Sequence, residues 1–483
     1  MINLKLTKEI SYDQQKQFAS LSGDFNPIHL NPNTARRELF GEIVVHGMHL
    51  ILSALDSFVM QNKIQKHIII DSLNVKFFSP ALVSKPLIFI FNFDEKLIKV
   101  EIRDTKKAIL SEMLIAYHSE QLTSKNIINK SFKVSQPDNI NIKSSIGLKG
   151  DFLLFLDKKL KNSLFPSLHI LADIQIAEIL VMTRIVGMKC PGKQSLFTGV
   201  NVVFEKSDNK LVRYFSKSIV EKFSMATIGF EGPTLNGQLS TFFRPESTNQ
   251  PNIEQVSENI PKNIFKGVNA LIIGGSRGIG ETTAKIIAAG GGESVITYNL
   301  GKDDAENVCE EINNAGFTSQ CFKLDIENFD KSLEEKILKF GFDVVFYYPS
   351  PKILASKIFD SQLFNNFLYY YVEQFENLIR QIRLTTVKKI IVFYPSTINI
   401  EEKTPGFTEY IMSKMAGEYL CDTLTREFEN INILVERLPR LQTDQTMNLQ
   451  NKIADSTLDV MLPIILRINE LISSLKKSNK NNK

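Results

Sequence analysis

A short apolar run followed at once by a glycine-rich turn is the feature that most constrains how this chain can fold. Residues 269–273 read Asn-Ala-Leu-Ile-Ile, and residues 274–280 read Gly-Gly-Ser-Arg-Gly-Ile-Gly. The apolar run predicts a buried strand, the glycines allow a tight turn, and a helix is expected to open at Glu281. Because glycine has no side chain, a pyrophosphate could approach the N-terminus of that helix closely.

The residues after this turn alternate between strand-like and helix-like segments, which is typical of a doubly wound parallel α/β sheet. Strands are expected at Ser294–Tyr298 and Ile390–Tyr394, with a further strand ending at Asp325. Further along, the spacing of Tyr410 and Lys414 puts both on one face of a helix. The ammonium group is therefore expected to lower the pKa of the phenol.

Ser396 follows the expected strand Ile390–Tyr394 and offers a hydroxyl that could hold a substrate carbonyl. With Tyr410 and Lys414, and with the glycine turn, it resembles the short-chain dehydrogenase/reductase family in order and spacing. We therefore assign residues 266–475 to a Rossmann-like domain of this type. The resemblance implies that Ser396, Tyr410 and Lys414 are catalytic. It also implies a cofactor site made by Gly274, Ser276, Arg277, Gly278, Ile279, Gly280, Asp325, Tyr410 and Lys414, in which Asp325 faces the adenine.

The choice of cofactor can be argued from two positions. An acidic residue at the end of the second strand would bind the ribose 2′-hydroxyl of NAD, but this chain has Thr297, Tyr298 and Asn299 there. Arg277 lies in the glycine turn, where its guanidinium could bind a 2′-phosphate bidentately. The sequence therefore predicts NADP as the cofactor.

The chain also departs from the family pattern. The family's Asn-Asn-Ala-Gly is replaced by Phe346–Ser350, its relay Asn has no clear counterpart near Phe367–Tyr371, and Pro439-Arg440 replaces Pro-Gly. A terminal strand is not expected, because Leu458–Leu475 is helix-like. These departures leave open whether this domain turns over a substrate.

A second motif lies near the start of the chain. Residues 22–29 read Ser-Gly-Asp-Phe-Asn-Pro-Ile-His, and residues 45–48 read Val-His-Gly-Met. An Asp and a His this close together can hold one water between them and move protons to and from it. A glycine at a helix N-terminus can offer its backbone N–H to a developing oxyanion.

These residues closely resemble the MaoC-like (R)-specific enoyl hydratase family of hot-dog proteins. The resemblance implies that Asp24 and His29 are the catalytic pair and that Gly47 supplies the oxyanion N–H. It also implies that Asn26 helps to hold the turn, and that His46 is structural.

Residues 1–120 are predicted to form this hot-dog domain. Tyr12–Ser22 is expected to be a short helix, and Gly47–Met60 is expected to be the buried central helix. Alternation of β-branched and aromatic residues predicts strands beyond it, at His67–Ile70, Leu73–Phe78, Pro86–Phe93, Lys96–Arg103 and Ala108–Tyr117.

Residues 147–244 repeat this arrangement without the motif, so we predict a second hot-dog domain there. A helix is expected at Ile170–Val186, and strands at Ser195–Phe204, Lys210–Lys217 and Leu239–Phe243. Its candidate polar residues are His169, Asp173 and Glu178, although such a His is more often a cap than a catalyst. Polar, Pro-containing residues 121–146 and 245–265 are expected to be linkers.

Composition excludes several classes of partner. The net charge is only +4 and is spread along the chain, so no nucleic-acid footprint is expected. The 4 cysteines lack metal-ligand spacing, which argues against zinc and disulfides and for a reducing compartment. No metal, signal peptide or transmembrane segment is predicted, so a cytoplasmic protein is expected.

Both resemblances concern C3 of an acyl thioester, attached to CoA or to an acyl carrier protein. The sequence therefore predicts a bifunctional enzyme that reduces 3-oxoacyl thioesters with NADPH and interconverts 3-hydroxyacyl and 2-enoyl thioesters. Assembly into a homo-oligomer is left open. Two alternatives stay open: a reductase whose hot-dog part only binds the acyl group, and a non-enzymatic NADP-binding scaffold. Chain length, direction and pathway are not specified by the sequence.

Overall fold

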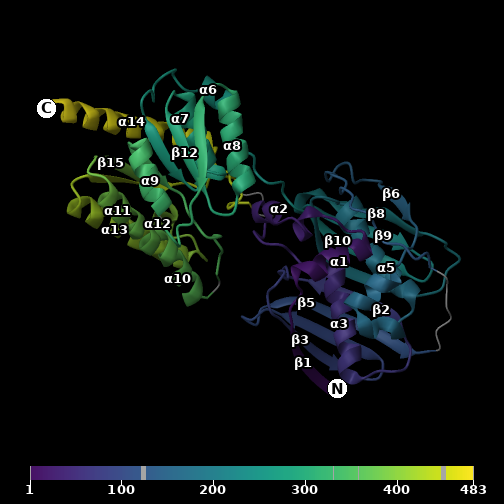
Figure 1. Ribbon diagram of the computed structural model, residues 1–483. Coiled ribbons are helices and arrows are strands. Elements are labelled where there is room, and N and C mark those ends of the chain that lie inside the picture. Colours follow the sequence, from purple (N-terminus) through teal and green to yellow (C-terminus); the bar gives the residue numbers. More distant parts are fainter. Residues whose placement is uncertain (1, 121–126, 330, 357, 448–452, 482–483) are drawn as a thin grey trace. The chain divides into compact units, whose positions relative to one another are not determined.

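The computed structural model describes residues 2–120, 127–329, 331–356, 358–447 and 453–481. It consists of two compact units, Met1–Glu246 and Ser247–Lys483, whose elements are labelled in Figure 1. We call them the first and the second unit. Among the described residues, no helix is both long enough and apolar enough to cross a bilayer.

The first unit is built on one sheet of ten strands in the order β1-β3-β4-β5-β2-β7-β10-β9-β8-β6, with every neighbouring pair antiparallel. The β2–β7 pair joins the strands of the first half of the unit to those of the second half. The strands are β1 (Ile2–Lys8), β2 (Ile68–Phe77), β3 (Leu87–Phe93), β4 (Leu97–Arg103), β5 (Ile109–Ser119), β6 (Lys149–Phe152), β7 (Ser195–Val203), β8 (Val212–Val220), β9 (Met225–Glu231) and β10 (Asn236–Phe243).

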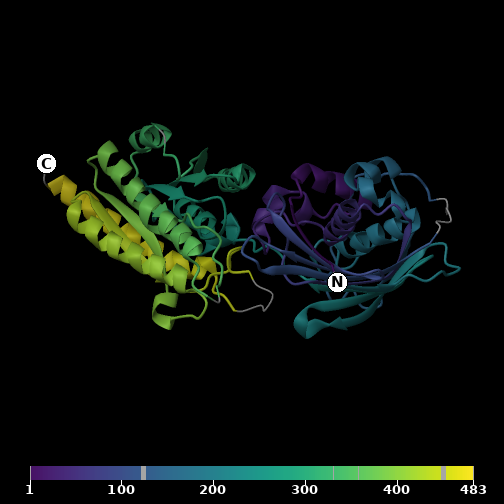
Figure 2. The same cartoon turned by 90° about the horizontal axis from the view of Figure 1, so that it is seen from below.

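The helices of the first unit gather on one side of this sheet, which curves beneath them (Figure 2). Helix α3 is apolar on nearly all sides and is buried almost completely, as a central helix must be. The helices are α1 (Tyr12–Ser22), α2 (Pro32–Arg37), α3 (Gly47–Asn62), α4 (Lys158–Leu164) and α5 (Asp173–Arg184), which runs on into a π-helical turn, η3 (Ile185–Lys189). Short 3₁₀ turns are η1 (Pro27–His29), η2 (Pro166–Ile170) and η4 (Glu221–Phe223).

The predicted strands of the first unit are confirmed at all the expected places. In β3, alternate residues are buried, which is the signature that made it predictable. The segments His67–Ile70 and Leu73–Phe78 are one strand, β2, because a bulge between Ile70 and Ser72 carries the chain across the break in alternation. Strands β1, β6 and β9 were missed by the sequence analysis.

Each expected linker has described residues that pack on a unit, although most of residues 127–146 are exposed. Residues 121–126 lie outside the described residues, but Phe132 packs on Ala19, Phe25 and Met188, and an aromatic side chain in a polar run can anchor it. In the second linker, α6 (Ile253–Glu258) buries Ile253 and Val256 completely. A capping box at Asn252 starts this helix, a signal that the Pro-rich composition obscured.

The second unit is a six-stranded parallel sheet in the order β13-β12-β11-β14-β15-β16, which is the doubly wound arrangement that the sequence predicted. Its strands are β11 (Asn269–Ile273), β12 (Glu293–Tyr298), β13 (Thr318–Lys323), β14 (Val344–Tyr347), β15 (Ile390–Thr397) and β16 (Ile431–Leu438). In the part of the chain that is described, β16 is the last strand. Helix α14 follows it, as expected.

Helices cover both faces of this sheet and make two cores. One core takes side chains from α7 (Gly278–Ala289), α8 (Lys302–Asn314) and α14 (Thr457–Asn481). The other takes side chains from α9 (Lys331–Phe340), α10 (Ser361–Leu368), the π-helical turn η5 (Tyr369–Glu373), α11 (Gln374–Thr385) and α13 (Thr408–Glu427). A short helix, α12 (Asn399–Glu402), precedes α13.

A buried ion pair ties the start of the first unit to its last strand, and it generates a stability prediction. The guanidinium of Arg244 pairs with Glu38 and donates to the carbonyl oxygens of Ser195 at 2.8 Å and Lys193 at 2.7 Å. Arg244→Met should lower the free energy of unfolding by about 3–5 kcal/mol, because it removes a buried cation that pairs with the Glu38 carboxylate. Calorimetry of the full chain measures this. The exposed pair Lys85–Glu42 is the control, and its loss should cost no more than about 1 kcal/mol.

Candidate active sites

The first candidate site is built on the turn that follows α1. Helix α1 ends at Gly23, whose φ of 77° places it in the left-handed region that favours glycine. A Cβ there would also meet Phe132 at 2.8 Å. The turn then continues into η1, where the Asn26 side chain accepts a hydrogen bond from the Ile28 N–H. The left-handed Gly23 and the Asn26 cap therefore fix the backbone conformation of residues 24–29.

Asp24 is almost completely buried, with both carboxylate oxygens hydrogen-bonded. Its Oδ2 accepts from the Thr183 hydroxyl at 2.6 Å, and its Oδ1 accepts from the Asn26 N–H at 3.1 Å. Burial raises the pKa of Asp24 to about 6, because the desolvation of the charge outweighs these two hydrogen bonds, which favour the ionised form. A carboxylate with this pKa can gain and lose protons near neutral pH.

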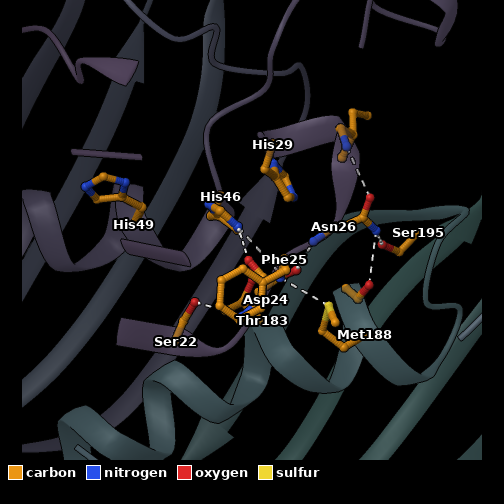
Figure 3. A network of polar contacts seen from close by, with 12 residues as sticks. Ser22, Asp24, Phe25, Asn26, His29, His46, His49, Thr183, Met188 and Ser195 are labelled. Atoms are coloured by element: carbon orange, nitrogen blue, oxygen red, sulfur yellow. Dashed lines mark hydrogen bonds and ion pairs between the residues drawn. The ribbon is translucent and has the colours of Figure 1, made fainter. Parts of the chain in front are cut away.

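His29 and His46 stack beside this carboxylate, with ring centroids 3.9 Å apart (Figure 3). His29 Nδ1 lies 2.7 Å from the Val44 carbonyl, so this nitrogen carries the hydrogen and leaves Nε2 with a lone pair. Burial lowers the pKa of His29 to about 4, which keeps the ring neutral. His46 donates from Nε2 to the Asp24 carbonyl at 3.0 Å. The sequence-predicted pair is thus brought together in a buried cluster.

Asp24, His29 and His46 each place one metal-ligating atom within 4.8 Å of the other two. Two polar atoms of this cluster already form hydrogen bonds. Asp24 Oδ2 accepts from the Thr183 hydroxyl, and His46 Nε2 donates to the Asp24 carbonyl oxygen. A nitrogen that donates cannot also ligate a metal. The cluster therefore fits proton transfer, and we assign no metal to it.

Gly47 is the first residue of α3, directly after His46. A Cβ on Gly47 would lie 2.8 Å from the Phe77 ring, so the position has no room for a larger residue. The first N–H groups of a helix have no partner within it, which is the property that the predicted oxyanion role requires. That role remains a prediction.

The second half of the unit supplies groups that the sequence analysis missed. Asn26 donates to the Gly187 carbonyl at 3.0 Å and to the Gly192 carbonyl at 2.9 Å, and Met188 Sδ accepts from the Phe25 N–H. Thr183 lies on α5 and Met188 on η3, far along the chain from the motif (Figure 3), and Gly187 also belongs to η3. Single residues at such a separation carry no local signal, so only the fold could reveal them.

The polar candidates of the second half have structural contacts. His169 is exposed and contacts the Pro166 carbonyl at 3.1 Å. Asp173 forms ion pairs with two lysines, and Glu178 accepts from the Thr234 N–H at 2.8 Å. Each of the three side chains thus has contacts within the second half.

The second candidate site begins at the glycine turn between β11 and α7. Gly274 and Gly278 have φ values of 80° and 58°, where glycine is favoured. A Cβ on Gly280 would lie 2.3 Å from the Gly274 carbonyl oxygen, so the turn closes tightly on the start of α7. Arg277 Nη1 lies 3.5 Å from Asp444 Oδ2. Ser276 is buried and Ile279 is partly buried.

Tyr410 and Lys414 share a face of α13, as predicted, but their electrostatics differ from the prediction. Burial raises the pKa of Tyr410 to about 12, and a hydrogen bond with the Thr397 hydroxyl offsets only part of this shift. Burial also lowers the pKa of Lys414 to about 7. The expected lowering of the phenol pKa is therefore wrong for this state, because desolvation dominates over the nearby charge.

The two hydroxyls at the end of β15 differ in their partners, and the expected position of Ser396 beyond the strand is wrong. Strand β15 continues through Thr397, so Ser396 lies within the strand and not beyond its end. Its Oγ donates to Glu418 Oε1 at 2.5 Å, whereas the hydroxyl of the next residue, Thr397, acts on Tyr410 and lowers the pKa of its phenol. Successive strand residues point to opposite faces, so one position decides which hydroxyl reaches the phenol.

Aromatic residues occupy the places where the sequence departs from the family pattern. Tyr348 follows β14, and its hydroxyl lies 2.8 Å from Thr283 Oγ1 on α7. Tyr371 lies in η5, and its hydroxyl is 2.6 Å from Ser350 Oγ. The Lys414 ammonium sits 3.8 Å from the centroid of the Tyr371 ring and donates to the Pro395 carbonyl at 2.7 Å.

Asp325 lies two residues beyond β13 and is half-buried. Its carboxylate accepts from the Glu327 N–H at 3.0 Å, which stabilises the turn at the carboxyl end of the strand. That edge of the sheet also carries the glycine turn, since β11, β12 and β13 are parallel neighbours. Its role toward an adenine remains a prediction.

Comparison with known proteins gives independent findings. A family model described as a MaoC like domain matches residues 2–109, and one described as short chain dehydrogenase matches residues 268–337. Uncharacterized oxidoreductases of Mycobacterium bovis and Mycobacterium tuberculosis are 27% identical over 188 residues, which is 35% of this chain and 52% of theirs. The chain thus spans about half the length of these curated relatives.

Solved structures are similar to part of this chain. The oxidoreductase yciK from E. coli is 18% identical, with a TM-score of 0.39, and the match covers 43% of this chain and 92% of that one. FolM alternative dihydrofolate reductase 1 from Brucella suis, in complex with NADP, is 19% identical, with a TM-score of 0.33, over 35% of this chain and 71% of that one. The family matches show that this chain carries a MaoC-like domain at its N-terminus and a short-chain dehydrogenase domain at its C-terminus.

Proposed function

We propose that the chain is a bifunctional acyl-thioester enzyme. The first unit interconverts 2-enoyl and (R)-3-hydroxyacyl thioesters, and the second unit reduces 3-oxoacyl thioesters with NADPH. The observation that carries the proposal is the buried Asp24–His29 cluster on a chain that also holds Tyr410 and Lys414 on one helix face. Both reactions take place at C3 of the same acyl group.

In the first unit, the ionised Asp24 carboxylate takes a proton from water. The water oxygen then bonds to C3 of the enoyl group, and Asp24 returns the proton to C2. Neutral His29 orients the water through the lone pair on Nε2, because its Nδ1 hydrogen is committed to Val44. The Gly47 N–H stabilises the negative charge that develops on the thioester oxygen.

Residues 147–244 form a second hot-dog half in this proposal. Helix α5 is buried against the same sheet as α3, and strands β6 to β10 continue that sheet. This half carries no acid–base pair of its own, since His169, Asp173 and Glu178 have structural contacts. Its part is to complete the walls of the site in the first half.

In the second unit, the turn from Gly274 to Gly280 holds the pyrophosphate of NADP, and Arg277 binds the 2′-phosphate. The fit rests on the tight turn at Gly280, where a Cβ would collide with the Gly274 carbonyl and where bare backbone meets the N-terminus of α7. A bound NADPH would supply the hydride. Asp325 contributes at the adenine end of the same sheet edge.

Tyr410 is the proton donor for the alkoxide that reduction leaves on the substrate. Its pKa of about 12 keeps the phenol protonated at neutral pH, so the proton to be donated is present before each reduction. Thr397, and not Ser396, is the hydroxyl that orients the substrate carbonyl, because it already contacts Tyr410. Lys414 stabilises the phenolate that forms.

One observation favours the alternative of a non-enzymatic NADP-binding scaffold. Tyr371 packs against the Lys414 ammonium and also contacts the Tyr410 ring, at 5.8 Å between centroids. An aromatic side chain there cannot relay a proton as readily as an amide–water chain, and it shields Lys414 from water. NADPH binding without turnover would support this alternative.

The first prediction on function concerns the acid–base pair. Asp24→Asn and His29→Ala should each lower the rate of 2-enoyl-CoA hydration by on the order of 10²–10⁴-fold, because a positioned proton-transfer group is removed. Loss of the enoyl absorbance and mass spectrometry of the product measure the rate. His169→Ala, at an exposed site, is the matched control. Unchanged rates in both variants would contradict the assignment.

The second concerns cofactor choice. The unmutated protein should bind NADPH more tightly than NADH, and Arg277→Ala should reduce that difference by roughly 10- to 100-fold, the worth of a charge-assisted hydrogen bond. Fluorescence titration with both cofactors measures the affinities. Arg383→Ala, on α11, removes a cation elsewhere and should leave the difference as it is. Equal affinities before mutation would refute NADP selectivity.

The third separates the two hydroxyls. Tyr410→Phe should abolish 3-oxoacyl-CoA reduction but preserve NADPH binding and enoyl hydration, since the phenol acts only in proton transfer. Thr397→Val should slow reduction far more than Ser396→Ala, because the Thr397 hydroxyl acts on the Tyr410 phenol whereas Ser396 is engaged with Glu418. NADPH consumption measures reduction. A larger loss in Ser396→Ala would show that Ser396 is the carbonyl-orienting residue after all.

A further inference from the structure

We propose that Thr183 is a positioning residue for Asp24, which holds the carboxylate in place and in its ionised form. The residue belongs to the second half of the first unit, outside the matched MaoC-like segment 2–109. The inference rests on the proposed hydration by Asp24 and His29, and it deepens that proposal. It makes the second half a part of the candidate hydratase site.

The contact is short and fully enclosed. The Thr183 hydroxyl donates to Asp24 Oδ2 at 2.6 Å, and the two residues are 3% and 1% exposed. A hydrogen bond to an ionised acceptor is stronger than a neutral one, and it strengthens further where water is excluded. Among the described residues, Thr183 is the side chain that donates to this carboxylate.

The helix around Thr183 is shaped to receive the carboxylate. Gly187 follows in η3, and a Cβ there would lie 2.3 Å from both oxygens of Asp24. The bare Cα therefore leaves the space in which the carboxylate lies. The Gly187 carbonyl also accepts from Asn26, so the same turn of helix holds two residues of the motif (Figure 3). Such π-helical turns are frequent at functional sites.

The other charged and titratable groups around Asp24 do not replace Thr183. His46 Nε2 lies 3.8 Å from Oδ2, but burial keeps the pKa of His46 well below its ordinary value, so the ring is neutral. His29 is neutral for the same reason. Arg184, next to Thr183, is directed between the rings of Phe132 and Phe152. The Asn26 N–H is thus the remaining donor to the carboxylate.

The hydrogen bond from Thr183 affects the pKa of Asp24. The hydroxyl donates to the charged carboxylate, so it opposes the rise in pKa that burial causes. Without it, the pKa of Asp24 should rise above about 6 and the ionised base should be present only at higher pH. A proton-accepting role in hydration is then weakened at neutral pH, although the fold of the site is retained.

The experiment compares Thr183→Val, which keeps the shape and removes the hydroxyl, with Thr183→Ser, which keeps the hydroxyl. In Thr183→Val, the acid limb of kcat/KM for hydration should move up by about one pH unit or more, the scale of a charged hydrogen bond. Thr183→Ser should restore the limb to its original place. Thr241→Val removes another buried hydroxyl of the unit, which donates to the Leu196 carbonyl, and should leave the limb unmoved.

An infrared titration of the Asp24 carboxylate, obtained as the difference from Asp24→Asn, gives the same pKa without any turnover. If the unmutated protein hydrates no enoyl thioester but the carboxylate titration moves in Thr183→Val, the proposed function fails and the positioning role stands. If it does hydrate and neither readout moves, Thr183 is only a packing residue and the inference is overturned. Should Thr183→Val not fold, Thr183→Cys, with a weaker donor, should give an intermediate shift, and no shift there would equally overturn it.

Discussion

The pairing of β2 with β7 is the constraint on which the first unit depends. These strands lie far apart in the sequence, yet they run antiparallel with Val75 opposite Val200. Because the pairing makes one continuous sheet, α3 and α5 are laid side by side on it. The N-terminal motif turn then meets the end of α5, and every contact of Asp24 and Asn26 with the second half follows from that encounter.

Burial shifts the pKa values of residues in both candidate sites. Asp24, His29, Tyr410 and Lys414 are all moved toward their neutral forms, because desolvation exceeds the pull of their partners. For Asp24 and Lys414 the shift brings the pKa close to neutrality, where a group can exchange protons. For Tyr410 it fixes the proton on the phenol. Desolvation by burial therefore leaves Asp24 able to exchange a proton near neutral pH and keeps the Tyr410 phenol protonated.

The second unit uses its parallel sheet to gather residues at one edge. The glycine turn, Asp325, Tyr348 and Thr397 all lie at the carboxyl ends of strands, where α/β sheets bind ligands. Around this edge, tyrosines stand where the family has amides and glycines. They fill the region with rings and hydroxyl contacts, and the shielding of Lys414 by Tyr371 is one result.

Much of this could be predicted from residues alone, because the signals are local. The glycine turn needs only neighbouring residues to specify a strand, a sharp turn and a helix, and the spacing of Tyr410 and Lys414 needs only helical periodicity. The motif from Ser22 to His29 likewise specifies its own turn through Gly23 and Asn26. The confirmed strands were predicted from apolar runs or from alternation of apolar residues, and both signals lie within neighbouring residues.

The tertiary structure decided what local signals cannot encode. Ser396 and Thr397 are equivalent hydroxyls in the sequence, and only the length of β15 and the alternation of its faces choose which one contacts Tyr410. The pKa of Tyr410 depends on burial, which overrides the charge that the spacing suggests. The sequence by itself determined the two domain types and the motif residues from which the candidate sites are built. Only the packing of distant segments decided the protonation of those residues and brought Thr183 to Asp24, because desolvation and long-range contacts exist only once the chain is folded.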